Sequence, residues 1–245
     1  MSKLISWDGV MKGALSMPGV KVDRDSFLLS TFSPYGNAKQ LLNSKPSDIY
    51  PDALIEKLAK NVIRNHTNKV TGLSAVAGIP GGLALFGTVP ADIAQFFYHF
   101  LVLAQKLAYL YGWPDLRDEN NNLGDGAQAV LTIFTGVAVG VNGANALVKE
   151  IAEQVAKNIG NKIARQALMK TAWYPIIKKI ASYIGIKISK DMVGKAASKA
   201  IPLIGAIVSG SLSYATFKPM AKKLQNELRI NSGTFNEPCI EILKA

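Results

Sequence analysis

Residues 78–113 read GIPGGLALFGTVPADIAQFFYHFLVLAQKLAYLYGW and join a half rich in glycine and proline to an apolar half. The second half predicts a helix from about Pro90, because proline is favoured in a first turn and the phenylalanines recur at helical spacing. The first half predicts a bent or hairpin element, because proline removes a backbone donor and glycine weakens a helix. The residues of this predicted hairpin are Gly78, Pro80, Gly81, Gly82 and Pro90.

A second apolar segment has the same composition. It opens at Pro202, continues through Gly205 and Gly210, and ends at Pro219. We therefore predict a second hairpin here and not one straight helix. Irregular backbone survives at membrane depth only where protein covers it. The two hairpins could therefore lie in the protein core or in a bilayer where other parts of the protein cover them.

Residues 126–148 form the longest stretch between these hairpins without a charged side chain. A helix of this length, at about 1.5 Å per residue, could cross the roughly 30 Å hydrocarbon core of a bilayer. Gly136 and Gly140 have the G-x-x-x-G spacing that lets helices approach closely. Small and polar residues such as Thr132 and Asn142 also suit a helix buried in a tight bundle, so both readings stay open.

These patterns predict an all-α protein, a compact multi-helix bundle with Gly/Pro-broken apolar helical hairpins. No stretch has the alternating pattern of a strand. From Asp52 onward, apolar residues at helical spacing predict a long helix. We expect an irregular segment with short helices over 1–50, a helical domain over 51–230 and a tail over 231–245.

The net charge of +11 is concentrated in the second half of the chain. Residues 1–125 hold 12 basic and 11 acidic side chains, and residues 126–245 hold 16 basic and 6 acidic ones, which gives +1 and +10. A field of this sign attracts the phosphates of anionic lipids or of nucleic acid. A solvated lysine face without a ligand is the alternative.

The lysines of the second half accompany apolar helical faces. The run WYPIIKKIASYIG predicts an amphipathic helix with Ile176, Ile180 and Ile184 on its apolar face, together with Ile177 and Tyr183. Such a helix can lie in a membrane interface or bury its apolar face in the protein core. Because exposed aromatic residues do not accompany the lysines, nucleic acid is an unfavoured partner. The predicted contacts with an anionic surface are Lys178, Lys179, Lys187, Lys190, Lys195, Lys199, Lys222 and Lys223.

Four polar residues share one edge of the helix that is predicted to start at Pro90. Asp92, Gln95, His99 and Lys106 fall within a stripe roughly 60° wide. The structural interpretation is a satisfied polar network in which Asp92 accepts hydrogen bonds from its neighbours. The functional interpretation is a ligand-orienting or proton-transfer site, with Asp92 and His99 as weak catalytic candidates.

The sequence lacks the usual signatures of catalysis and cofactor binding. It has no G-x-S-x-G elbow, no H-E-x-x-H pair and no G-K-[ST] phosphate loop. Its single cysteine, Cys239, cannot form an intramolecular disulfide and suits a reducing compartment. We therefore expect no metal and no cofactor, and we prefer a binding protein to an enzyme as the interpretation of the sequence.

Several stretches resemble the bacterial EcsC family. They are KVTGLSAVAGIPGGLALFGTVPADIAQFFYHFLVLAQKLAYLYGWPDL over 69–116, VDRDSFL over 22–28, GVNGANA over 140–146, KTAWYPIIKKIASYIGIKISK over 170–190 and IPLIGAIVSGSLSYATFKPMAKKLQ over 201–225. The resemblance covers roughly residues 20–230. It implies a membrane-associated bacterial protein at the inner face of the cell membrane, near a transporter, and supplies no catalytic residues.

Three functions follow as expectations. The first is a non-enzymatic membrane-associated protein that binds an anionic phospholipid surface and supports an ABC-type transporter or another membrane protein. It would be cytoplasmic, peripheral to the membrane or partly inserted. The second is a soluble protein that binds a lipid or hydrophobic ligand, with Asp92, Gln95 and His99 holding its polar head. The third is a hydrolase-like enzyme that uses Asp92 and His99.

Overall fold

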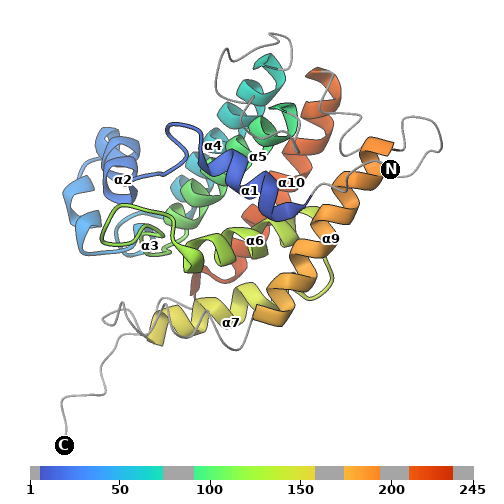
Figure 1. The fold of residues 1–245 in the computed structure, drawn as a ribbon. Coiled ribbons are helices and arrows are strands. Elements are labelled where there is room, and N and C mark those ends of the chain that lie inside the picture. Colours follow the sequence, from blue (N-terminus) through green and yellow to red (C-terminus); the bar gives the residue numbers. More distant parts are fainter. Residues whose placement is uncertain (1–5, 74–90, 158–173, 194–209, 234–245) are drawn as a thin grey trace, which may run out of the picture.

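The computed structural model describes residues 6–73, 91–157, 174–193 and 210–233, which form helices and their connections (Figure 1). No strand occurs in these ranges, so the predicted all-α class is confirmed. The elements are α1 (Trp7–Leu15), α2 (Arg24–Phe32), η1 (Ser33–Tyr35), η2 (Ala38–Leu42), α3 (Pro46–Ile49), α4 (Asp52–Leu73), α5 (Ala91–Leu110), α6 (Asp125–Val139), α7 (Ala144–Lys157), α9 (Tyr174–Val193) and α10 (Gly210–Ile230).

Helix α5 forms the centre of the bundle. It packs against α1, α2, α4, α6 and α10. Its phenylalanines and leucines are fully buried, as expected for a helix that is apolar on nearly all sides. The predicted start at about Pro90 agrees with the observed first residue, Ala91.

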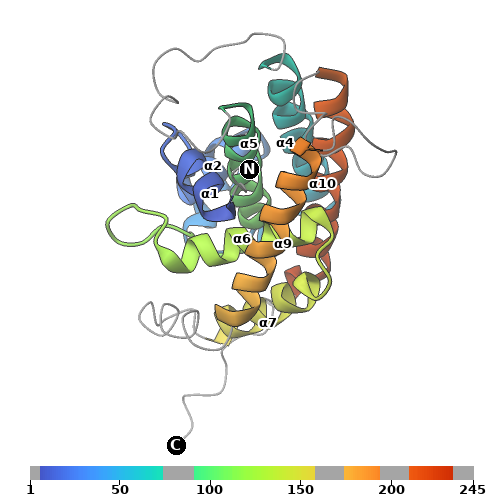
Figure 2. The ribbon, with the colours of Figure 1, turned by 45° about the vertical axis from the view of Figure 1, so that its right-hand side comes forward.

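The remaining long helices pack on α5 directly or through α6 and α10. Helix α4 packs against both α5 and α10, and α10 also packs against α6. Helix α6 in turn contacts α7 and α9. Two views show α9 at the outside of the bundle (Figures 1 and 2).

The 23-residue span considered for 126–148 is wrong, because two helices share this stretch. Helix α6 ends at Val139, and Gly140 follows with φ 78°, a left-handed conformation that glycine adopts easily. The Val141 N–H donates to the Gly136 carbonyl at 2.8 Å and closes the helix end. Among the described residues, no helix is both long and apolar enough to cross a membrane.

Gly136 lets α6 and α9 approach closely, as its spacing predicts. A Cβ atom built at Gly136 would lie 2.8 Å from Ile180 Cγ2 on α9 and 3.3 Å from Ala144 Cβ on α7. Gly140, the second glycine of the motif, has a different role as the left-handed residue after α6. The predicted close contact between helices therefore belongs to Gly136 alone.

The predicted hairpins are only partly within the described residues. Gly78, Pro80, Gly81, Gly82, Pro90, Pro202 and Gly205 lie outside them, and Gly210 is the first residue of α10. The sequence predicts that an apolar segment ends at Pro219, but α10 continues through this residue to Ile230. Pro219 is exposed, while Phe217 and Met220 beside it are buried. Packing of this face holds the helix together across the proline, which costs about 3 kcal/mol in a helix interior.

The segment before α4 consists of short elements whose apolar side chains enter the common core. Ser6 caps α1 by accepting from the Gly9 N–H at 3.1 Å, and Asp23 caps α2 by accepting from the Ser26 N–H at 2.7 Å. Trp7 is buried and donates from Nε1 to Thr132 Oγ1 at 2.9 Å. These short helices are therefore fixed by long-range contacts as well as by their caps.

Candidate functional site

Both histidines of the chain meet between α4 and α5. His66 on α4 is 4% exposed and His99 on α5 is 7% exposed. Their ring centroids lie 5.9 Å apart, with an angle of 65° between the ring planes. Because α4 and α5 are neighbours, two residues far apart in sequence form one buried imidazole pair.

Lys106 lies beside this pair. Its Nζ is 3.4 Å from His66 Nε2 and 5.7 Å from the centre of the Phe27 ring. Since an ammonium group can only donate, His66 Nε2 must accept, and the ring proton of neutral His66 then sits on Nδ1. The Nδ1 atoms of both His66 and His99 are buried without a hydrogen-bond partner among the described residues. Buried polar atoms of this kind are uncommon in folded proteins.

The electrostatics of this cluster are set by burial and by lysines. Burial, with the positive charge of Lys106 next in importance, lowers the pKa of His66 to about 3. Burial and the charge of Lys69 lower the pKa of His99 to about 4. Burial also lowers the pKa of Lys106, and the charge of Lys69 adds to this effect. At neutral pH both imidazoles are therefore uncharged, and the positive charge of the site belongs to the lysines.

The cluster contains no compensating anion among the described side chains. None of the ion pairs among the described residues involves Lys106 or Lys69. No carboxylate is among the causes of the three pKa shifts. Within the same part of the chain, no three His, Cys, Asp or Glu side chains are grouped as a metal ion would need. The site can therefore offer positive charge and N–H donors to a ligand.

The predicted polar stripe of α5 divides into separate parts. Asp92 and Lys106 are 14 residues apart, about 21 Å along one helix, so they cannot hold the same small group. His99 and Lys106 both join the His66 cluster. Gln95 is half-buried. Asp92 lies in the first turn of α5, but its side chain is outside the described set, and with it the predicted hydrogen bond in which it accepts from His99.

His66 is the member of the cluster that the sequence interpretation missed. It follows the buried residues Ile55, Ala59 and Ile63 at helical spacing and precedes the buried Val70. A histidine within the apolar register of a helix indicates a buried imidazole. Its pairing with His99 needs the α4–α5 contact, which the sequence does not display.

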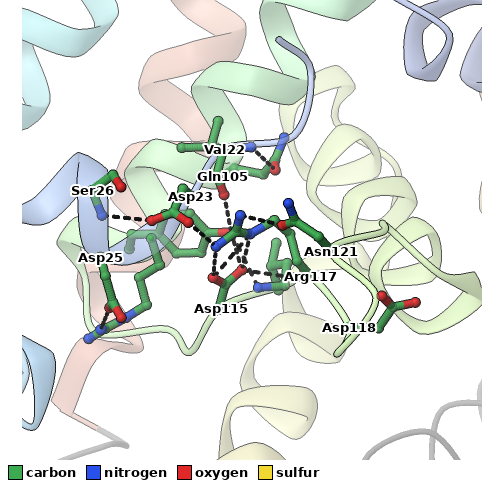
Figure 3. A network of polar contacts seen from close by, with 12 residues as sticks. Val22, Asp23, Asp25, Ser26, Gln105, Asp115, Arg117, Asp118 and Asn121 are labelled. Carbon is green, nitrogen blue, oxygen red and sulfur yellow. Dashed lines mark hydrogen bonds and ion pairs between the residues drawn. The ribbon is translucent and has the colours of Figure 1, made fainter. Parts of the chain in front are cut away.

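A second polar network joins the N-terminal segment to the chain after α5 (Figure 3). The Arg117 guanidinium lies between two carboxylates, with Nη2 2.6 Å from Asp23 Oδ2 and 2.7 Å from Asp115 Oδ2. It also donates to Asn121. These contacts raise the pKa of Arg117, and the Ser26 N–H and Arg117 lower the pKa of Asp23.

Gln105 extends this junction into the core. Its side chain is fully buried, accepts from the Val22 N–H at 3.1 Å and donates to the Val20 carbonyl at 2.8 Å. Tyr109, one turn later, donates to the Val22 carbonyl at 3.3 Å. The stretches 22–28 and 69–116, both quoted above for their resemblance to EcsC proteins, thus meet here. Their polar residues at this junction have an architectural role.

The lysine-rich surface is centred on α9, whose apolar face differs from the predicted one. Ile180 and Ile184 are buried as predicted, but Ile176 is 42% exposed and Tyr183 is 46% exposed. Ile186 is also 46% exposed. The predicted face is too wide because only its central residues contact α6 and the core.

The predicted anionic contacts are distributed over two helices. Lys178 and Lys179 are exposed on α9, and Lys222 and Lys223 are exposed on α10. Lys187 and Lys190 belong to α9, but their side chains are outside the described set. Lys195 and Lys199 lie outside the described residues altogether.

Comparison of the chain with protein-family models, with curated proteins and with solved structures finds no match. The resemblance to the EcsC family therefore stays a prediction. Two features of the molecule bear on its function: the cluster of His66, His99 and Lys106, and the exposed face of α9.

Proposed function

We propose that this protein is a non-enzymatic, membrane-associated bacterial protein that binds an anionic phospholipid surface through α9. The observation that carries the proposal is the exposure of large apolar side chains beside lysines on one face of this helix. Ile176, Tyr183 and Ile186 are each more than two-fifths exposed, and Lys179 is exposed between them. At 100° per residue, these four residues lie within about 80° of one another around the helix axis.

An interfacial helix needs both kinds of side chain. Apolar side chains enter the boundary between headgroups and acyl chains, and lysines remain at the level of the phosphates. Each lysine near an anionic surface contributes about 1 kcal/mol. Full burial of an isoleucine side chain contributes about 1.5–3 kcal/mol to the free energy of binding. Only the surface that is exposed in the free protein counts toward this value. A few such contributions support reversible binding that high salt weakens.

The net charge of the second half supports the same partner. Residues 126–245 carry +10, and the exposed lysines of α10 add to the field around α9. An anionic surface is the complement of this charge. A cytoplasmic position at the inner face of the membrane, and a transporter or other membrane protein as a further partner, are proposed on the EcsC resemblance alone.

Liposome flotation tests this proposal. We expect the protein to float with vesicles that contain phosphatidylglycerol, and to stay in the soluble fraction with pure phosphatidylcholine vesicles or after a high-salt wash. Two double variants, Ile176→Ser with Ile186→Ser and Lys178→Gln with Lys179→Gln, should each reduce flotation. Equal recovery in the soluble fraction with and without anionic lipid, at low salt, would contradict the proposal.

The matched control removes the same amount of positive charge from another part of the chain. Lys39→Gln with Lys57→Gln removes two exposed lysines from the first half of the chain. This variant should float like the unchanged protein. If it loses flotation as much as the α9 variants, net charge alone drives binding and α9 is not the contact surface.

A further inference from the structure

The group of the buried His66 and His99 and the half-buried Lys106 has an excess of donors and positive charge over acceptors. The Lys106 ammonium has three N–H groups, and its described contacts are His66 Nε2 and the Phe27 ring. A charged group that is partly removed from water normally has a partner of opposite charge, because its lost hydration must be compensated. Among the described residues, no carboxylate forms an ion pair with Lys106.

Both histidines add unsatisfied polar atoms to the same place. The Nδ1 atom of each ring is buried and lacks a hydrogen-bond partner among the described residues. Neutral His66 carries its proton on Nδ1, since Nε2 faces the ammonium group. A metal ion is a poor occupant, because Lys106 would repel it. An anionic oxygen fits, because it accepts hydrogen bonds and compensates the ammonium charge.

We propose that the cluster of His66, His99 and Lys106 binds the anionic group, carboxylate or phosphate, of a small ligand. Lys106 supplies the charge and a hydrogen bond, and the two imidazoles supply further polar contacts. Lys69, exposed on α4 and close enough to affect all three groups electrostatically, attracts the anion to the site. This proposal is independent of the membrane contact through α9.

The two histidines also supply a specific signal for the experiment. The chain has only two imidazoles, and both belong to the proposed site. Long-range proton–nitrogen NMR spectra should therefore show two histidine side chains whose ring nitrogens shift when an anion binds. The probes are inorganic phosphate, acetate and octanoate, with ionic strength matched by sodium chloride. An anion that binds only to surface lysines would leave both rings unchanged.

The expected result is saturable movement of both imidazole signals with at least one probe. Octanoate binding more tightly than acetate would identify the ligand as an amphiphile with an acyl chain, whereas equal affinity would identify a small anion. Saturation by phosphate alone would identify a phosphate ligand. Absence of any imidazole shift with all three probes would overturn the proposal.

Lys106→Met separates binding from folding. Methionine keeps the length of the apolar stem and removes the ammonium group. We expect affinity for the anion to fall by about tenfold or more, since charge-assisted hydrogen bonds are the strong ones. The ligand-free variant should have a higher Tm than the unchanged protein, because a half-buried charge without an ion-pair partner among the described residues is gone. Lys57→Met, an exposed change of the same charge on α4, should leave affinity unchanged. Unaltered affinity in Lys106→Met would overturn the assignment.

Discussion

Gln105 shows how much one buried amide can fix. Its carboxamide bonds the backbone of Val20 and Val22, more than 80 residues earlier in the chain. A buried backbone group that loses its partner costs about 1–3 kcal/mol. This side chain therefore fastens the N-terminal segment to the central helix.

We expect Gln105→Met to reduce the free energy of unfolding by about 2–4 kcal/mol, because the Val22 N–H and the Val20 carbonyl lose their partner. Methionine has a similar length and a good helix propensity, so the change isolates the hydrogen bonds. Urea denaturation measures the effect. Gln95→Met, on the half-buried side of the same helix, should change stability by less than about 0.5 kcal/mol. Similar losses in both variants would show that the amide contacts have no special role.

At the residue scale, some of the buried or half-buried polar residues were predictable from the sequence and others were not. Lys106 and His99 were detectable because they interrupt an apolar helix at regular spacing. His66 and Gln105 were missed because their roles depend on which helix or connecting segment lies opposite. A single sequence shows the spacing within a helix, whereas the partner across an interface depends on tertiary packing.

At the element scale, Gly136 sets the distance between α6 and α9. A Cβ atom at this position would meet Ile180 Cγ2 at 2.8 Å, and Ile180 is almost fully buried. We expect Gly136→Ala to lower the free energy of unfolding by about 1–3 kcal/mol through overpacking. Thermal or urea denaturation measures this loss.

Two comparisons separate overpacking from helix propensity. Gly72→Ala places the same methyl group in open space on α4 and should be neutral or stabilising by up to about 1 kcal/mol. Ile180→Leu removes the Cγ2 atom, so Gly136→Ala should cost less in that background. An undiminished cost in the double variant would rule out this contact as the cause.

The helical elements were predictable from spacing, but their ends were less so. The long helices from Asp52 and from about Pro90 agree with α4 and α5. The end of α6 was missed because Gly140 lies in an uninterrupted apolar run, and only its positive φ marks the turn. At Pro219 the error was the opposite one, since an end was predicted where the helix continues. Tertiary packing keeps α10 helical across a residue that normally breaks helices.

At the scale of the whole molecule, the buried histidines make stability depend on pH. In the folded protein their pKa values are about 3 and about 4, whereas an unfolded histidine has a pKa of about 6.5. Between these values the unfolded state binds more protons, so stability falls as pH falls. Carboxyl groups titrate mostly below about pH 5, which leaves the range from pH 7 to 5 to the histidines.

We expect the free energy of unfolding to drop by about 2 kcal/mol per histidine between pH 7 and pH 5. Urea denaturation at several pH values measures this slope. His99→Gln should remove about half of the drop, and His66→Gln with His99→Gln should remove nearly all of it. A stability that stays constant over this range in the unchanged protein would show that the imidazoles are not held neutral by the fold.

The all-α class was the most predictable property of the whole molecule, because apolar spacing and the lack of strand patterns extend over the full chain. The single core that includes both Trp7 and Leu228 was not predictable in the same way. It arises from contacts between distant segments. The same reason explains why the exposed part of the α9 face could not be separated from its buried part.

The junction around Arg117 also bears on synthesis of the chain. Asp23 lies 94 positions before its partner Arg117, and Trp7 lies 125 positions before Thr132. At a translation rate of about 5–20 residues per second, Asp23 precedes Arg117 by roughly 5–20 s. During this interval the first helices cannot dock in their final places on the ribosome-bound chain. Their apolar faces stay exposed during this time, and transiently exposed apolar surface promotes aggregation.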